Sequence, residues 1–205
     1  MGLRKVRHFL GRVAPDPGWP VALSIASLSV LAQIGGDSAR EWLRFDRTAI
    51  AAGEVRRLLT GHFVHLGWSH AAMNVAGLVL IWLLVGGLFT SLQWLIVGLV
   101  SILIIDAGFW LKETQLEWYV GLSGLLHGIL AAGVVRGLGR SGAEAWFLGA
   151  VLALKIGYEQ FAGPLPGSAS AAGGPVIVNA HLYGAIGGAI AALLLHRSAG
   201  RAASI

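Results

Sequence analysis

The chain of 205 residues contains no cysteine and few charged residues. The lack of cysteine excludes disulfides, thiolate nucleophiles and cysteine-based metal sites. Charged residues make up 12% of the chain and hydrophobic residues 56%, and the mean hydropathy is +0.72. A soluble domain of this length cannot bury so much apolar surface in one core. The composition therefore indicates a membrane protein.

Glycine and tryptophan, in contrast, are abundant, with 30 and 8 residues. Tryptophan anchors proteins at membrane interfaces, and glycine lets membrane helices approach closely. The net charge of +5 also suits nucleic-acid binding, but the basic residues lie at the ends of apolar segments and form no solvated patch. We therefore expect membrane lipid as a partner and no nucleic acid.

Six apolar segments each approach the roughly 20 residues that cross a bilayer core. We expect an all-α, polytopic membrane protein with six transmembrane helices in one domain over residues 1–205. Residues 1–17 form a basic tail that resembles the start of a signal peptide, but five further apolar segments follow, so we expect the first helix to be retained. The expected helices are 19–34, 69–88, 92–111, 122–138, 145–161 and 176–196.

Charge at the helix ends predicts the orientation. Under the positive-inside rule the basic tail lies in the cytoplasm. The tail carries Arg4, Lys5, Arg7 and Arg12, and the same side receives Arg136, Arg140, Arg197 and Arg201. The long first loop, residues 35–65, is also rich in arginine and would then lie outside.

Two connecting segments have patterns of their own. In the first loop, Trp42, Phe45 and Ala49 share one helical face opposite charged residues, which indicates either a helix lying in the interface or an ordinary folded loop. Residues 163–175 are small residues and prolines. We expect the latter to form a mobile cap.

A serine and a histidine lie near the starts of the fourth and sixth helices, in Gly121-Leu122-Ser123-Gly124 and Ala180-His181-Leu182-Tyr183-Gly184. Both helices run in the same direction, so the two side chains lie at similar depth, roughly 5–10 Å below the outer boundary. A hydroxyl beside a neutral imidazole is the minimum set for an activated serine.

Glycines predict that these two helices pack against each other. Gly124 and Gly128 form a small-xxx-small step on one helix, and Gly184 and Gly188 form another on its partner. Each step begins within a turn of Ser123 or His181. We therefore expect the closest approach of the helices at this pair.

The second helix supplies donors for an oxyanion. His70 and Asn74 are four residues apart, hence on one helical face. Both can donate hydrogen bonds, as can the backbone N–H of Ser123. His62 and His65 are expected to have structural roles near the interface.

These strings resemble those of rhomboid intramembrane serine proteases. The matching pieces are His65-x4-His70-x3-Asn74, Gly121-x-Ser123-Gly124 and Ala180-His181-x2-Gly184-x3-Gly188, in order across six helices. The resemblance implies a serine endopeptidase with Ser123 as nucleophile and His181 as base, without a cofactor or metal. It places His70 and Asn74 at the oxyanion. The residues expected to line the site are His65, Gly121, Gly124, His127 and Tyr183.

Two departures from the usual rhomboid pattern refine this expectation. His127, within GLSGLLHG, takes the place of a tyrosine, and with TGHFVH it resembles the rhombosortase branch. That branch implies transmembrane substrates with a glycine-glycine C-terminal sorting segment. It also implies a bacterial inner membrane with the site opening outward. The second departure is Arg56-Arg57 in place of a Trp-Arg pair. We therefore expect the first loop to pack differently from that of other rhomboids.

Other functions remain open. Ser123 could be a packing residue, and the histidines could bind metal or haem, although no carboxylate is evident beside them. The chain could also be a non-catalytic helix-packing protein. Lys155 and Glu159 are expected to pair with each other, and Asp106 to be bonded locally. With no carboxylate to orient His181, we expect a Ser–His dyad.

Overall fold

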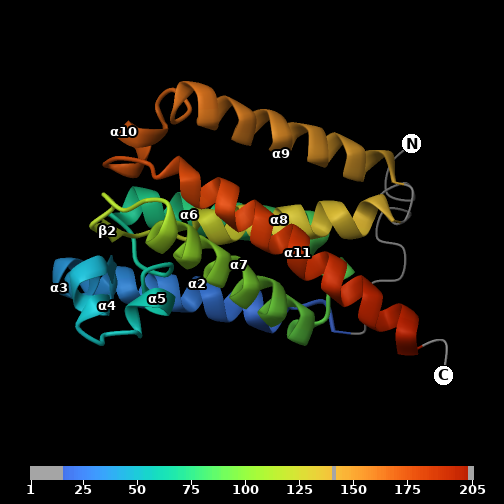
Figure 1. Cartoon of the computed structure of the whole chain (residues 1–205), viewed down its shortest axis with the longest axis horizontal. Helices are drawn as coiled ribbons and strands as arrows, with labels where there is room; N and C mark the ends of the chain where they lie inside the picture. Colours follow the sequence, from blue (N-terminus) through green and yellow to red (C-terminus); the bar gives the residue numbers. More distant parts are fainter. Residues whose placement is uncertain (1–15, 140–141, 203–205) are drawn as a thin grey trace.

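The chain folds into a bundle of long helices, seen in a computed structural model that describes residues 16–139 and 142–202 (Figure 1). The basic residues of the tail and Arg140 lie outside the described residues, as do the side chains of Arg197 and Arg201. The long helices are α2 (Trp19–Ile34), α6 (Trp68–Val85), α7 (Ser91–Leu111), α8 (Ser123–Leu138), α9 (Ala143–Ala162) and α11 (Val178–Ala202).

The long helices lie at the six expected places, but fewer satisfy the length and hydropathy of a membrane span. Among the described residues, three do so: α6 with the short η1 (Gly86–Leu88), α7, and Val178–His196 of α11. A fourth is added if α2 and α3 (Gly36–Leu43), which meet at a bend of 118°, form one broken span. Helix α8 is short and α9 carries internal charges, which is why the sequence count of six exceeds this number.

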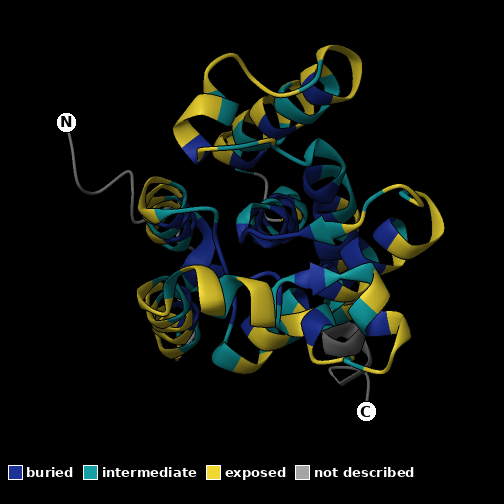
Figure 2. Ribbon diagram, turned by 90° about the vertical axis from the view of Figure 1, so that its left-hand side faces the viewer, coloured by how far each residue is buried: buried dark blue, intermediate teal, exposed yellow. Residues whose placement is uncertain are grey.

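Helix α8 lies at the centre of the bundle. Ten of its sixteen residues are buried, and it packs against α6, α7, α9 and α11. Large apolar side chains are exposed instead on the surrounding helices, for example Leu31, Leu83, Leu103 and Leu154. Figure 2 shows the same division, with buried residues inside the bundle and exposed residues around it. An apolar outer surface of this kind suits a lipid environment.

The folded connecting segments gather at the end where α6, α8 and α11 begin (Figure 1). These are α3, α4 (Arg47–Ala51), α5 (Arg57–Thr60), α10 (Ser168–Ala172) and a two-stranded sheet. Strand β1 (Phe45–Asp46) pairs antiparallel with β2 (Trp118–Tyr119), in the register Phe45 to Tyr119. The sheet ties the first loop to the segment that leads into α8.

The prediction that Trp42, Phe45 and Ala49 share one helical face in the first loop is wrong. Phe45 lies in β1, fully buried against Phe109 and Tyr119, whereas Trp42 on α3 is exposed. The strand interrupts the helical periodicity, so Trp42, Phe45 and Ala49 do not share a face. Of the two alternatives left open by the sequence, the loop is a folded one with several short helices.

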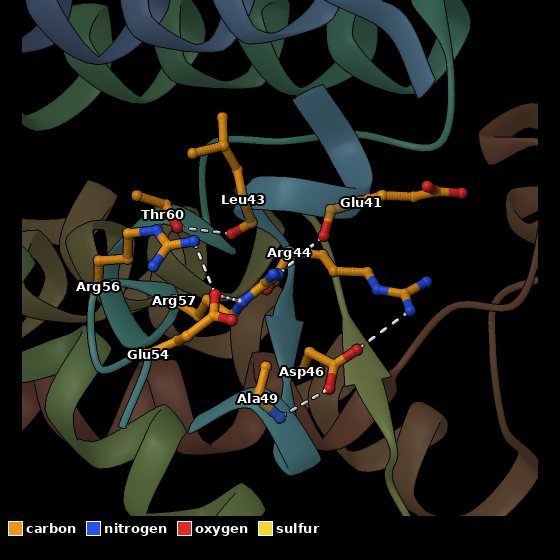
Figure 3. Close-up of polar contacts among 9 residues, drawn as sticks. All are labelled: Glu41, Leu43, Arg44, Asp46, Ala49, Glu54, Arg56, Arg57 and Thr60. Carbon is orange, nitrogen blue, oxygen red and sulfur yellow. Dashed lines mark hydrogen bonds and ion pairs between the residues drawn. The ribbon is translucent and has the colours of Figure 1, made fainter. Parts of the chain in front are cut away.

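Arg57 holds this loop together. Its guanidinium donates to the backbone carbonyls of Glu41 and Arg44 and to the carboxylate of Glu54, at 2.8–3.1 Å (Figure 3). The hydrogen bond from Arg57 lowers the pKa of Glu54 below its usual value. Arg56 instead lies over the ring of Trp42 near the surface. In the Arg56-Arg57 pair, the second arginine therefore organises the loop.

The glycine- and proline-rich segment between α9 and α11 contains a turn of helix, α10. The hydroxyl of Ser69, at the start of α6, donates to the carbonyl of Ala171 at 2.7 Å. The segment expected as a cap therefore rests on the beginning of α6.

Candidate active site

Ser123 and His181 lie side by side at the starts of α8 and α11. The hydroxyl oxygen of Ser123 is 3.0 Å from Nε2 of His181. Only 4% of His181 is exposed, whereas Ser123 is partly exposed, so the imidazole is buried and the hydroxyl can still be reached. The structure thus brings together the two residues that the sequence singled out, 58 positions apart.

Backbone contact between α8 and α11 makes this distance possible. A Cβ on Gly184 would overlap the carbonyl oxygen of Gly124, and one on Gly188 would overlap that of Gly128. The two glycine steps therefore lie at the closest approach of the helices. Any larger residue here would push His181 away from Ser123.

The expectation that no carboxylate lies near His181 is wrong. Oε2 of Glu159, on α9, is 2.8 Å from Nδ1 of His181, and Nζ of Lys155 is 2.7 Å from the same carboxylate oxygen. The expected pairing of Lys155 with Glu159 is confirmed. Their spacing of four predicts the ion pair, whereas the contact of Glu159 with His181 depends on how α9 packs against α11 and does not follow from that spacing.

His127 contacts both members of the pair. Its ring stacks on that of His181, with centroids 4.1 Å apart and planes 18° apart. Its Nδ1 lies 2.7 Å from the backbone carbonyl of Ser123. A carbonyl only accepts, so Nδ1 carries the hydrogen. The stacked ring holds His181 over Ser123.

Donors for an oxyanion come from His70 and the turn before α8. The backbone N–H of Leu66 donates to Nδ1 of His70 at 3.4 Å, so Nε2 of His70 carries the hydrogen. This edge of the ring faces Gly121, whose φ of +130° suits only glycine and where a Cβ would lie 3.1 Å from Cε1 of His70. The N–H of Ser123 is at the helix start, where N–H groups lack intrahelical partners.

Asn74 lies one turn further along α6 and is buried. Its amide donates to the backbone carbonyl of His70 at 3.0 Å. The amide has a second N–H, so Asn74 can position His70 and still donate to a ligand.

Two residues expected in the site turn elsewhere. The ring centroids of His65 and His70 are 5.0 Å apart with the ring planes nearly perpendicular, which places His65 behind the candidate donors. The hydroxyl of Tyr183 donates to Glu113 on the far side of α11, next to Asn179. Tyr183 therefore fixes α11 to the segment after α7 and does not face Ser123.

The expected local bonding of Asp106 is also wrong. Its carboxylate is 3.2 Å from Nε2 of His62, 44 positions earlier, and both are buried. The ring of His62 meets the edge of Tyr119, whose hydroxyl donates to the carbonyl of Gly121. This buried chain supports the turn that leads into Ser123.

The side chains of His127, Glu159 and His181 offer possible ligand atoms within 4.8 Å of one another. An imidazole binds a metal along the plane of its ring, at about 2.0–2.1 Å for zinc. The rings of His127 and His181 are stacked, with centroids 4.1 Å apart and planes inclined by only 18°. No position lies in both ring planes and also within that metal-bonding distance of a nitrogen of each ring. The observed arrangement therefore does not fit a metal held by both histidines.

The fold and the site define a multi-pass helical membrane protein with a serine next to a histidine between two helix starts. Residues 52–198 match the Rhomboid domain family, so the chain belongs to the rhomboid family of intramembrane serine proteases. A comparison with curated proteins finds no match.

Proposed function

We propose that this chain is an intramembrane serine endopeptidase with Ser123 as nucleophile and His181 as general base. The observation that carries the proposal is the 3.0 Å contact between Ser123 Oγ and Nε2 of a buried imidazole. Nε2 takes the hydroxyl proton as Oγ bonds to the scissile carbonyl carbon. The C–N bond then breaks, and the imidazolium gives its proton to the leaving amine. Water, activated by His181, releases the acyl group from Ser123.

Three donors hold the negative oxygen that forms in this step. They are the N–H of Ser123, Nε2–H of His70 and the free amide hydrogen of Asn74. Their support is that the ring of His70 lies against Gly121, that the described hydrogen bonds leave one donor hydrogen on His70 and one on Asn74, and that Ser123 begins its helix. Each such donor contributes roughly 10²–10³-fold to kcat in serine hydrolases.

The substrate lies extended beside the segment that precedes Ser123. A cavity of about 260 Å³ separates residues 115–120 from Pro175 and Ile177, with Leu66 at its wall. An extended peptide there can bond to the backbone of the segment, as in strand addition. Val120, three residues before the nucleophile, lines this cavity, so a peptide bound there would lie along the segment that leads to Ser123.

The substrates are exported proteins with a glycine-glycine sorting segment ahead of a C-terminal membrane helix. Support comes from the rhombosortase-like strings GLSGLLHG and TGHFVH. It also comes from the two rings that contact Ser123, His127 at its backbone carbonyl and His181 at its hydroxyl, because such a site favours small residues beside the scissile bond.

The protein spans a bacterial inner membrane six times, and its site opens outward. All three helices that carry the site begin at the end where the connecting segments gather, while Arg136 lies near the far end of α8 (Figure 1). The sixteen residues of α8 span about 24 Å. This length suffices for a central helix shielded from lipid by its neighbours.

Co-expression with a reporter tests the activity and the substrate class together. The reporter carries a glycine-glycine segment, a membrane helix and a basic tail. Wild type is expected to cleave it, and Ser123→Ala is not. Ser101→Ala, which alters a buried serine bonded within α7, is the matched control and keeps activity. Cleavage by Ser123→Ala contradicts the mechanism, and equal cleavage of a leucine-leucine reporter contradicts the substrate class.

Metal binding is the second candidate because of the cluster of His127, Glu159 and His181. The stacked rings oppose it. Stoichiometric metal in purified wild type, lost in His127→Ala and combined with an unreactive Ser123, would favour metal binding over proteolysis.

A further inference from the structure

The carboxylate of Glu159 is held where it can fix the state of His181. Oε2 lies 2.8 Å from Nδ1, on the opposite side of the ring from the 3.0 Å contact with Ser123. Glu159 is 3% exposed, so water does not compete for this bond. Ser123, His181 and Glu159 thus form one continuous hydrogen-bonded row across α8, α11 and α9.

A charged glutamate at this position destabilises the fold, which suggests that its contact with His181 serves the function. Glu159 lies in the last turn of α9, where the helix dipole disfavours negative charge, and Gly163 N–H bonds to its carbonyl. Burial of a carboxylate adds a further cost that only partners offset. The described partners are Lys155, one turn earlier, and His181 on another helix.

The contact determines which nitrogen of His181 carries the proton. An ionised carboxylate only accepts hydrogen bonds, so Nδ1 must carry a hydrogen that it donates to Glu159. Nε2 then presents its lone pair to the hydroxyl of Ser123. Lys155 Nζ is also 3.3 Å from Nδ1, but Nδ1–H offers it no lone pair, so the ammonium donates to Oε2.

We infer that Glu159 is a positioning residue of a Ser–His–Glu triad, holding His181 in the tautomer that accepts the proton of Ser123 and stabilising the imidazolium that results. The inference rests on the proposed protease function. Without the carboxylate, Lys155 is free to donate to Nδ1, which would move the hydrogen to Nε2. In that tautomer His181 donates to Ser123 and cannot act as its base.

The triad makes α9 part of the catalytic apparatus. This helix lies at the edge of the bundle, with an exposed outer face that includes Trp146, Phe147 and Leu154 (Figures 1 and 2). Its inner face carries Glu159 to His181. The reactivity of Ser123 therefore depends on how α9 is seated on α8 and α11.

The rate at which a fluorophosphonate labels Ser123 tests the inference without a known substrate. Replacing the carboxylate that orients a catalytic histidine costs roughly 10⁴-fold in kcat in serine proteases. We expect a loss of this order for Glu159→Gln, and partial recovery in Glu159→Asp, which restores the charge on a shorter side chain. Thermal unfolding of each variant in detergent verifies that the fold is retained.

Lys155→Met is the matched control, because it breaks the same ion pair from the other side and leaves Glu159 against His181. Its labelling rate should remain within about tenfold of wild type, the upper end of what one ion pair contributes. Equal losses in Lys155→Met and Glu159→Gln would show that the ion pair matters only for helix packing and would overturn the inference.

The pH dependence of labelling separates positioning from mere folding. The titratable side chains that surround His181 are Glu159 and Lys155 on α9, His127 on α8 and His70 on α6. Only neutral His181 can act as base, and Glu159 favours its protonated form. Loss of the carboxylate therefore moves the acid limb of the profile to lower pH, and loss of Lys155 moves it to higher pH. A misfolded variant loses rate at every pH without moving the limb.

The outcomes separate the inference from the function beneath it. An unlabelled wild type contradicts the protease itself. A wild type that labels only at Ser123, with Glu159→Gln equal to it in rate and in pH profile, overturns the triad and leaves the protease standing.

Discussion

The ring of His127 lies flat on the ring of His181, with centroids 4.1 Å apart. The same side chain donates from Nδ1 to the carbonyl of Ser123 at 2.7 Å. One residue on α8 therefore touches the backbone of the nucleophile and the face of its base. The sequence predicted only that His127 lines the site, and the structure shows both a stacked ring and a backbone hydrogen bond.

His127→Ala should lower kcat/KM while leaving the fold intact. Loss of the stacked ring and of the hydrogen bond together removes about 2 kcal/mol, or roughly 30-fold in rate. His127→Phe keeps the ring and loses only the bond, so its expected loss is roughly fivefold. Reporter cleavage measures both. Equal effects of the two substitutions would show that the ring contact contributes nothing.

Gly184→Ala should destabilise the protein and reduce activity together. The added Cβ overlaps the carbonyl of Gly124 and forces α8 and α11 apart. Overpacking of this kind costs about 1–3 kcal/mol, which lowers Tm by roughly 5 °C. Gly157→Ala on α9, where a Cβ would meet nothing within 4 Å, is the control and should keep Tm and activity. An unchanged Tm in Gly184→Ala would contradict the close approach.

Arg57→Ala should loosen the first loop. The substitution leaves the carbonyls of Glu41 and Arg44 without their donor. Buried acceptors that lose their donor cost about 1–3 kcal/mol each, and these two are only partly buried, so we expect a loss of roughly 2 kcal/mol in the free energy of unfolding. Arg56→Ala, which removes a surface pair and a ring contact, should cost below about 1 kcal/mol. Thermal unfolding and limited proteolysis of residues 36–60 measure the difference. Comparable losses from both arginines would refute the assignment.

His65 should make stability depend on pH. Burial, with a smaller contribution from the charge of His70, lowers the pKa of His65 to about 3. Neither ring nitrogen has a hydrogen-bond partner among the described residues. His65 binds a proton near pH 6.5 in the unfolded chain and near pH 3 in the folded chain. The folded state is therefore favoured fully at pH values above 6.5, and this contribution of His65 to the free energy of unfolding is lost as the pH falls toward 3.

The expected loss between pH 6.5 and pH 5 is about 2 kcal/mol. His65→Phe removes the titrating group, so the free energy of unfolding of this variant should change less with pH over this range. Unfolding of both proteins in detergent at a series of pH values measures the effect. Parallel curves for wild type and the variant would exclude His65 as the source.

Hydropathy located the helices well because each apolar segment is continuous. The first expected helix, 19–34, and α2 have the same bounds. The contact between Ser123 and His181 could also be predicted from the sequence, because glycines spaced by four on both helices allow only a narrow range of helix packings.

The parts that sequence missed depend on how a helix is rotated or on pairing across long separations. Glu159 reaches His181 only because α9 turns that face inward, and a spacing of four fixes Lys155 relative to Glu159 without fixing either relative to α11. Phe45 is buried because β1 pairs with a strand more than seventy positions later. Local periodicity contains no information on either contact.

The identity of the nucleophile is most directly tested by mapping the adduct of a fluorophosphonate probe by mass spectrometry. In wild type we predict a single adduct on Ser123, at a rate far above that of other serines. The adduct should be absent in Ser123→Ala and strongly reduced in His181→Ala, because without the imidazole the hydroxyl is not activated. Labelling at another serine, or equal labelling of Ser123 in His181→Ala, would contradict the account.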